Sequence, residues 1–216
     1  TTNLAGIDPR VRVAVPSCGG SGDLTVDVKQ MPGGVRTKRS ALELACISDN
    51  AYVPHIRCPL LWLSPTNDFH GLIDHMAWNW RQIPDEQLRL SISPHFNHRH
   101  ADPQAITEYL FFEQHLKNSF TLPKTPQAVL SVSKDSQVPT VAVRPDESLA
   151  VQRVEVFYSQ DPHTITRFWH SANVTKPSDS AVPVGREWRA ECPLLDVSQP
   201  LFVFANVTYE LPQRYQ

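Results

Sequence analysis

The pattern of apolar and polar positions divides the chain into two halves of different character. In the first half, continuous apolar runs alternate with stretches of helical spacing, which is the pattern of an α/β domain. In the second half, short β-branched and aromatic runs recur between clusters of Pro, Asp and Ser, which predicts an all-β domain. The segment Leu122-Pro-Lys-Thr-Pro126 separates them, because its two prolines interrupt both kinds of element. We therefore predict an α/β domain over residues 1–122 and a β-sandwich of immunoglobulin-like type over residues 127–216.

The elements expected in the first half follow each other in an ordered series. They are the end of a helix at Thr1 to Gly6, a brief strand at Arg12 to Pro16, a helical stretch at Ala41 to Cys46, a strand at Cys58 to Ser64, a helix at Leu72 to Arg81, a strand at Gln87 to Ser93 and an amphipathic helix from Gln104 to Lys117. Six strands are expected in the second half, at Ala128 to Val132, Thr140 to Val143, Val151 to Tyr158, Ile165 to Ser171, Glu187 to Cys192 and Leu201 to Tyr209.

Side chains with catalytic potential follow the two main strands of the first half. The run Cys58 to Ser64 is continuously apolar, as in a buried parallel strand, and Asp68 comes directly after it. The next strand ends before Pro94-His-Phe-Asn-His-Arg-His100. Functional groups in α/β sheets gather outside the carboxyl ends of the strands. An imidazole there can bond the Asp68 carboxylate on one side and face a nucleophile on the other, which predicts Asp68 as catalytic acid and a histidine of this loop, His95, His98 or His100, as base.

Other interpretations of these residues stay open at this point. Asp68 lies in Thr-Asn-Asp, a sequence typical of turns and helix caps. His95 and His100 are alternatives to His98 as the base, and all three histidines with Asp102 contain enough donors for a metal-dependent hydrolase. Asp74 and His75 are expected on a helix surface. The aromatic residues of the region are expected in the core, although Phe69 and His70 could form the wall of a pocket; the set is Trp62, Phe69, Trp78 and Trp80.

Composition and charge exclude several classes of partner. The 216 residues are 41% hydrophobic and 19% charged, and the 20 basic and 22 acidic residues give a net charge of −2. This balance predicts no nucleic-acid partner and no basic membrane patch, and no apolar run is long enough to span a bilayer. The glycines of residues 17–22 lack the Lys-Ser or Lys-Thr of a phosphate loop, so we predict no cofactor. The four cysteines lack paired zinc spacing and are expected to be free buried thiols or one disulfide.

Three segments resemble the α/β-hydrolase superfamily, in particular the dienelactone-hydrolase and acetylxylan-esterase-like branch that includes PhoPQ-activated pathogenicity-related proteins. They are Asp8-Pro-Arg-Val-Arg-Val-Ala-Val-Pro16, Leu61-Trp-Leu-Ser-Pro-Thr-Asn-Asp-Phe69 and Asn97-His-Arg99. In that family the first follows the nucleophile elbow, the second ends in the triad acid and the third supplies the histidine. Carried over to this chain, the resemblance implies Asp68 as the catalytic acid and His98 as the base. The resemblance implies that the fold is the C-terminal part of an α/β-hydrolase sheet followed by the sandwich. It also implies a serine-type hydrolase of small-molecule esters, with acylated carbohydrates among the candidate substrates.

The nucleophile that the resemblance requires has no match in the chain. No Gly-x-Ser-x-Gly motif occurs, and the family places it about half a dozen residues before the position of Thr1. We therefore expect the nucleophile on an N-terminal segment or a companion chain. Ser17, Cys18 and Ser21 are substitutes to consider, although they lack the glycine spacing of an elbow.

Two other classes remain open from the sequence. A terminal threonine can act as a nucleophile with its own amine as base, but Thr1-Thr2-Asn3 has the pattern of mid-helix sequence. The second half could instead be a non-catalytic module that binds carbohydrate or protein, in which case its exposed aromatic residues would carry the binding.

Overall fold

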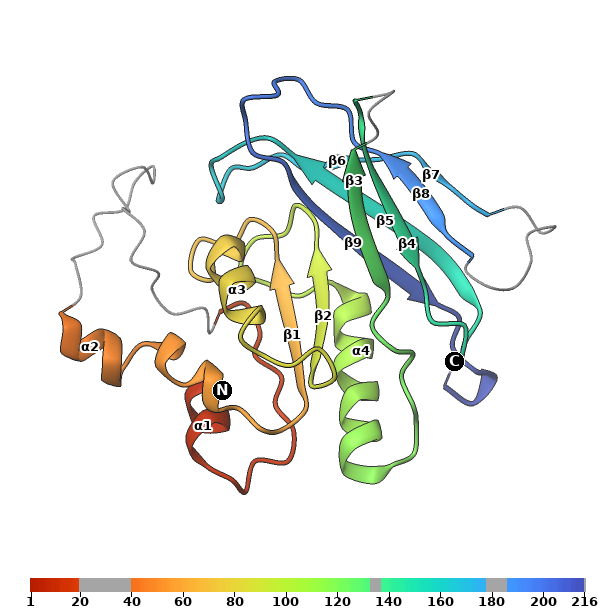
Figure 1. The fold of residues 1–216 in the computed structure, drawn as a ribbon. Coiled ribbons are helices and arrows are strands. Elements are labelled where there is room, and N and C mark those ends of the chain that lie inside the picture. Colours follow the sequence, from red (N-terminus) through yellow and green to blue (C-terminus); the bar gives the residue numbers. More distant parts are fainter. Residues whose placement is uncertain (20–39, 133–136, 178–185, 216) are drawn as a thin grey trace. The chain divides into compact units, whose positions relative to one another are not determined.

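The protein folds into two compact units in the computed structural model, which describes residues 1–19, 40–132, 137–177 and 186–215 (Figure 1). The first unit comprises Thr1–Leu122 together with His163–Thr166. The second comprises Pro123–Pro162 and Arg167–Gln216. The short segment His163–Thr166 therefore belongs to the first unit although it lies far along the chain.

The elements of the first unit occur close to their predicted positions. In chain order they are α1 (Thr2–Ile7), α2 (Ala41–Cys46), two 3-10 turns (Asp49–Ala51 and Val53–His55), β1 (Leu60–Pro65), α3 (Ile73–Trp80), β2 (Leu88–Ser93), α4 (Asp102–Phe112) and a π-helical turn (Glu113–Lys117). The predicted helix from Gln104 to Lys117 thus begins earlier and changes to π geometry in its last turn. Asn118 ends it in the left-handed conformation, at φ 55°.

The sheet of the first unit is parallel. β1 and β2 pair from Leu60 with Leu88 to Pro65 with Ser93, so both strands end at the same edge. The segment before residue 19 runs parallel along the other side of β1, through bridges from Ala14 to Leu60 and from Ser17 to Leu63. The predicted strand at Arg12 to Pro16 therefore contains one isolated bridge, at Ala14, and the second bridge, at Ser17, follows its predicted end.

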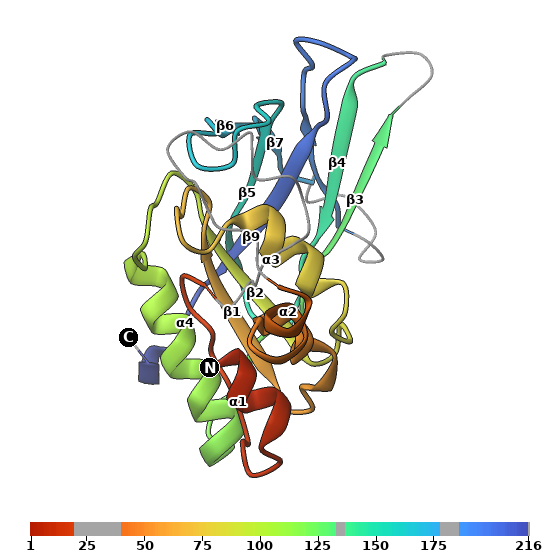
Figure 2. The same cartoon turned by 90° about the vertical axis from the view of Figure 1, so that its left-hand side faces the viewer.

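Helices cover both faces of β1, as expected of a strand whose six residues are all buried (Figure 2). On one face, Leu61 and Leu63 form a core cluster with Phe111 of α4. On the other face, the indole of Trp62 meets Trp80 of α3 edge-on, with ring centroids 6.4 Å apart. Burial on both faces explains why β1 is continuously apolar rather than alternating.

The second unit consists of antiparallel sheets. One sheet has the order β3 (Gln127–Val132), β4 (Pro139–Arg144), β8 (Trp188–Glu191) and β7 (Val174–Thr175); the other has the order β6 (His170–Ser171), β5 (Val151–Ser159) and β9 (Phe202–Tyr209). Five of the six predicted strands occur at their expected places. The predicted strand from Ile165 to Ser171 is wrong for most of its length, since only His170–Ser171 is extended, and β7 was not predicted.

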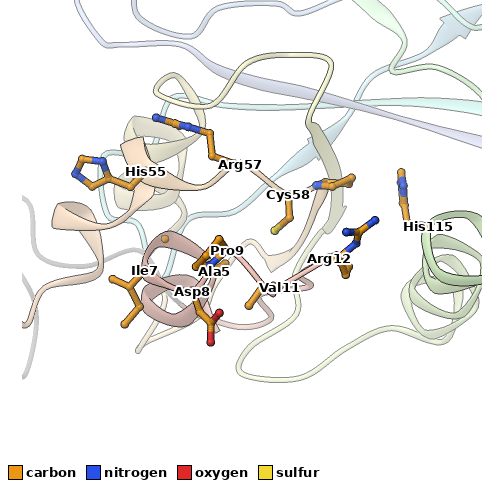
Figure 3. Close-up of a pocket in the computed structure, with 12 residues that line it drawn as sticks. Ala5, Ile7, Asp8, Pro9, Val11, Arg12, His55, Arg57, Cys58 and His115 are labelled. Atoms are coloured by element: carbon orange, nitrogen blue, oxygen red, sulfur yellow. The ribbon is translucent and has the colours of Figure 1, made fainter.

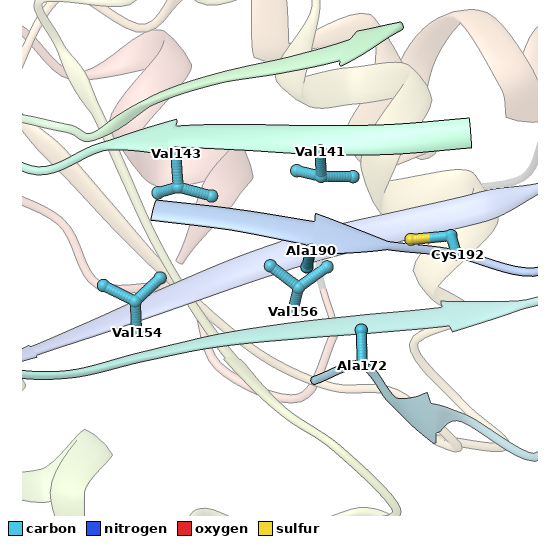
Figure 4. Packing of buried hydrophobic residues seen from close by; sticks show 7 residues of the cluster. All are labelled: Val141, Val143, Val154, Val156, Ala172, Ala190 and Cys192. Carbon is cyan, nitrogen blue, oxygen red and sulfur yellow. The ribbon is translucent and has the colours of Figure 1, made fainter. Parts of the chain in front are cut away.

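An apolar cluster joins residues from both sheets of the second unit (Figure 4). It is formed by Val141, Val143, Val154, Val156, Ala172, Ala190 and Cys192. Burial raises the pKa of the Cys192 thiol to about 11, so this cysteine behaves as a small apolar residue. All four cysteines are free thiols, so of the two alternatives that the sequence left open, the one with a disulfide is wrong.

The mixed helix and sheet content is compatible with the predicted α/β class. The hydrolase sheet and the immunoglobulin-like topology stay predictions. In the described part of the chain, no helix combines the length and apolar character needed to cross a membrane.

Candidate functional site

The loops that follow β1 and β2 are joined to each other by hydrogen bonds at the shared edge of the sheet. The Thr66 amide donates to Ser93 O at 3.0 Å, and the Asn67 amide donates to Phe96 O at 3.0 Å. The His95 amide donates to Thr66 Oγ1 at 2.8 Å. These bonds extend the strand register into the loops, so the side chains that follow are held at fixed positions relative to each other.

Asp68 and His98 meet at the end of these loops. His98 Nδ1 lies 2.9 Å from Asp68 Oδ2 and 3.1 Å from Oδ1. The carboxylate is completely buried, whereas the imidazole is 45% exposed. A buried carboxylate thus holds one ring nitrogen of a histidine whose other side is open to solvent or a ligand.

Backbone amides fix the orientation of the Asp68 carboxylate. The His70 amide donates to Oδ1 at 2.7 Å, and the Gly71 amide donates to the same oxygen at 3.0 Å. This is the local bonding expected of an Asp in a turn, and it leaves Oδ2 for the closer contact with His98. The turn-forming interpretation and the catalytic one are therefore compatible, since the turn aims the carboxylate at the imidazole.

The alternative histidines do not join this arrangement. Within residues 1–19, 40–132, 137–177 and 186–215, the group of three His, Cys, Asp or Glu side chains with donor atoms within 4.8 Å of one another is Cys18, Asp68 and His98. His95 and His100 are not part of it, so the structure does not bring the donor atoms of His95, His98 and His100 together as the metal alternative would require. The backbone of His95 is in the left-handed conformation, at φ 60°.

Cys18 lies beside the Asp68–His98 pair, where the segment next to β1 ends. Its amide donates to Leu63 O at 3.1 Å, and its backbone is left-handed at φ 50°. Burial and the charge of Asp68 raise the pKa of the Cys18 thiol, although a contact with the Ser17 hydroxyl opposes this. Cys18 therefore keeps its proton at neutral pH and lacks thiolate character. Ser21, the third residue considered as a substitute nucleophile, lies outside the described residues.

Aromatic rings surround the exposed side of His98. The His70 ring meets the His98 ring edge-on at 5.0 Å between centroids, and Phe69 lies 5.7 Å from His98. Phe69 is 45% exposed, so it is not the core residue that the sequence suggested. Trp78, at 55% exposed, also contradicts its predicted core position.

A family model for PhoPQ-activated pathogenicity-related proteins matches residues 28–169, more than half of the chain. The chain belongs to this family. The match spans both Asp68 and His98, and it begins after Cys18. No curated protein and no solved structure gives a match.

A segment far along the PhoPQ-related chain completes the acid loop, and sequence reasoning missed it. Asn67 Nδ2 donates to Ile165 O at 3.0 Å, and Thr164 Oγ1 donates to Asp74 Oδ2 at 2.5 Å. Both contacts lie within the first unit, because His163–Thr166 belongs to it. The predicted surface position is therefore wrong for His75, which is buried, whereas Asp74 is half-buried and binds this segment.

A cavity of about 500 Å³ lies at the other end of β1 in this PhoPQ-related protein (Figure 3). Its wall includes Cys58 and Pro59, which precede β1, and it contains neither Asp68 nor His98. Its charged and titratable lining residues are Asp8, Arg12, His55, Arg57 and His115. This cavity is therefore separate from the Asp68–His98 pair.

Proposed function

We propose that this PhoPQ-related chain carries the acid and the general base of a serine-type ester hydrolase. The observation that supports the proposal best is the contact between buried Asp68 and Nδ1 of half-exposed His98. A carboxylate accepts from Nδ1–H, and this fixes the neutral imidazole in the tautomer whose Nε2 can take a proton. The substrate is a small ester, with acylated carbohydrates as the class that the family resemblance suggests.

The chemistry that follows from this pair is acyl transfer. A serine hydroxyl gives its proton to His98 Nε2 while its oxygen attacks the ester carbonyl. The imidazolium that forms is stabilised by Asp68 and returns the proton to the leaving alcohol oxygen, which leaves an acyl-enzyme. Water then enters by the same route, and its attack releases the acid and restores the serine. In this proposal the serine precedes Thr1 in the intact protein.

Cys18 is not the nucleophile in this proposal. Thiol nucleophiles act as thiolates, and their pKa is lowered by positive neighbours. Burial has the largest effect on the pKa of the Cys18 thiol and raises it, and the charge of Asp68 raises it further.

Labelling with a fluorophosphonate probe tests the proposed function. Such probes form a covalent bond with a serine only where a base activates it. We expect the intact protein to be labelled once, on a serine before Thr1, and the His98→Ala variant to lose at least nine tenths of the labelling rate. His100 is an exposed residue close to His98 in the chain, so His100→Ala is the matched control and should be labelled at the wild-type rate. Labelling that persists undiminished in His98→Ala, or that maps to Cys18, would overturn the proposal.

The segment His163–Thr166 gives a second test, through the bond from Asn67. Asn67→Ala removes the donor to Ile165 O next to the catalytic acid and also the Oδ1 that accepts from the Thr66 hydroxyl. We expect a loss of stability of about 1–3 kcal/mol, typical of two hydrogen bonds, and a lower kcat with little change in KM, because the acid loop is less firmly positioned. Asn3→Ala is the control, since it removes a similar bond to Ile47 O from α1. Equal kcat losses in both variants would rule out a specific positioning role.

A further inference from the structure

Three different metal-binding groups meet at one point of the first unit. The thiol of Cys18, the carboxylate of Asp68 and the imidazole of His98 each present a donor atom within 4.8 Å of the others. We propose that these residues bind a zinc-like divalent cation through one sulfur, one oxygen and one nitrogen atom. The proposal concerns binding and does not require that the protein be a hydrolase.

The thiol is held in place by its own surroundings. Ser17 bridges to Leu63 and the Cys18 amide donates to Leu63 O, so the end of this segment is fixed to β1. The Trp62 indole donates to Gly19 O at 3.0 Å from the same strand. A non-glycine residue at φ 50° is unfavourable by itself, and it persists here because contacts on both sides of Cys18 hold the backbone.

Gly71 brings the thiol segment and the acid loop together. A Cβ atom on Gly71 would lie 2.7 Å from Gly19 Cα and 3.0 Å from the Cys18 carbonyl carbon, so the two backbones are in direct contact. The Gly71 amide also donates to Asp68 Oδ1. One close backbone contact therefore places the sulfur and the carboxylate on the same side of the site.

The donor set selects the type of cation. A thiolate and an imidazole favour zinc and similar metals over Mg²⁺ and Ca²⁺, which take oxygen ligands. Binding of the ion displaces the thiol proton of Cys18 to solvent. The thiolate that forms and the carboxylate together balance the two charges of the ion, and three protein ligands leave one position of a tetrahedron for water. Bond lengths of about 2.0–2.3 Å separate tetrahedral donors by about 3.3–3.8 Å. The donor atoms lie within 4.8 Å of one another, so the widest pair closes by at most roughly 1–1.5 Å, whereas His98 Nδ1 and Asp68 Oδ2, at 2.9 Å, open slightly. His98 can supply this movement, because its side chain is 45% exposed.

Occupation of the site has one consequence that rests on the proposed function. A cation bound to Asp68 and His98 uses the same carboxylate and imidazole that would activate a serine. Zinc binding and ester hydrolysis are therefore mutually exclusive, and zinc acts as an inhibitor of hydrolysis rather than as a cofactor.

Titration of the full, reduced chain with Co²⁺ tests the site. Cobalt replaces zinc in such sites, and thiolate ligation gives a sulfur-to-cobalt charge-transfer band together with the intense d–d absorption of four-coordinate Co²⁺. We expect one equivalent to bind, displaceable by Zn²⁺. Cys18→Ser should lose the charge-transfer band, and Cys46→Ser, which changes an exposed thiol elsewhere, should keep it. His98→Ala should weaken binding at least tenfold, and its exposed position protects the fold.

The outcomes separate this inference from the hydrolase proposal. Any one of four results would overturn the metal site. They are the absence of a stoichiometric Co²⁺ band, a band that persists in Cys18→Ser, a band that is lost in Cys46→Ser, and an unchanged Co²⁺ affinity in folded His98→Ala. If Cys18→Ser does not fold, the Co²⁺ affinity of His98→Ala decides whether the metal site exists. If the chain binds cobalt but the intact protein is not labelled by a fluorophosphonate, the metal-site proposal stands and the hydrolase proposal fails. If the protein is labelled but binds no cobalt, the hydrolase proposal stands and the metal-site proposal fails.

Discussion

Replacing Asp68 with Asn in the intact protein should lower kcat for p-nitrophenyl acetate by about 10³–10⁴-fold. The amide is nearly the same size as the carboxylate, and Oδ1 can keep its bonds from the His70 and Gly71 amides. The group that then faces His98 Nδ1 becomes an NH₂ donor, so Nε2 carries the ring proton and cannot accept one from a nucleophile. His98→Ala removes the base itself and should cost about 10²–10⁴-fold.

The comparison among variants makes this prediction specific. The two residues act as a unit, so the double variant should be little worse than either single variant. His95→Ala and His100→Ala are the controls, because neither side chain belongs to the group formed by Asp68 and His98. Steady-state kinetics on folded protein provides the measurement. Full activity in both Asp68→Asn and His98→Ala would remove these residues from the site, and a large loss in His95→Ala or His100→Ala would reassign the base.

The meeting of Asp68 and His98 could be anticipated from the sequence because it depends on short-range order. Each side chain follows a strand by a few residues, and parallel neighbours end at the same edge. Apolar runs define these strands, so the loops after them are located as soon as the runs are recognised. The choice of His98 over His95 and His100 came from the family resemblance, and loop geometry decides which of the three reaches Asp68.

The features that the sequence did not reveal depend on long-range contacts. Ile165 contacts the acid loop through a backbone carbonyl, which has no residue-type signal at all. Asp74 and His75 were expected on the surface because they are polar residues in a helix, and their partners and burial come from tertiary packing. Cys18 lies near Asp68 because a third segment runs beside β1. The sequence predicts a strand in this segment, at Arg12 to Pro16, but it does not indicate which strand that segment pairs with.

Gly71→Ala should be the most damaging small substitution in the first unit. The added Cβ would lie 2.7 Å from Gly19 Cα and 2.8 Å from Gly19 N, against ordinary carbon contacts of about 3.5–4.0 Å. Both clashing atoms belong to the backbone, so no side-chain rotation relieves them, and the acid loop must move away from Cys18. We expect the free energy of unfolding to fall by about 1–3 kcal/mol, as for other overpacked sites. Because the Gly71 amide orients Asp68, ester hydrolysis and Co²⁺ binding should fall together.

Gly19→Ala is the matched control for this contact. It adds the same methyl group to the other side of the junction, where the nearest atom is Ser17 O at 4.0 Å. Both substitutions reduce the conformational entropy of the unfolded chain by a similar amount, which stabilises each protein by about 0.4–1 kcal/mol. The difference between the two urea unfolding curves therefore isolates the steric effect. If the two variants unfold alike, or if Gly71→Ala keeps wild-type stability and activity, the two loops are not in the close contact on which both the acid's position and the metal site depend.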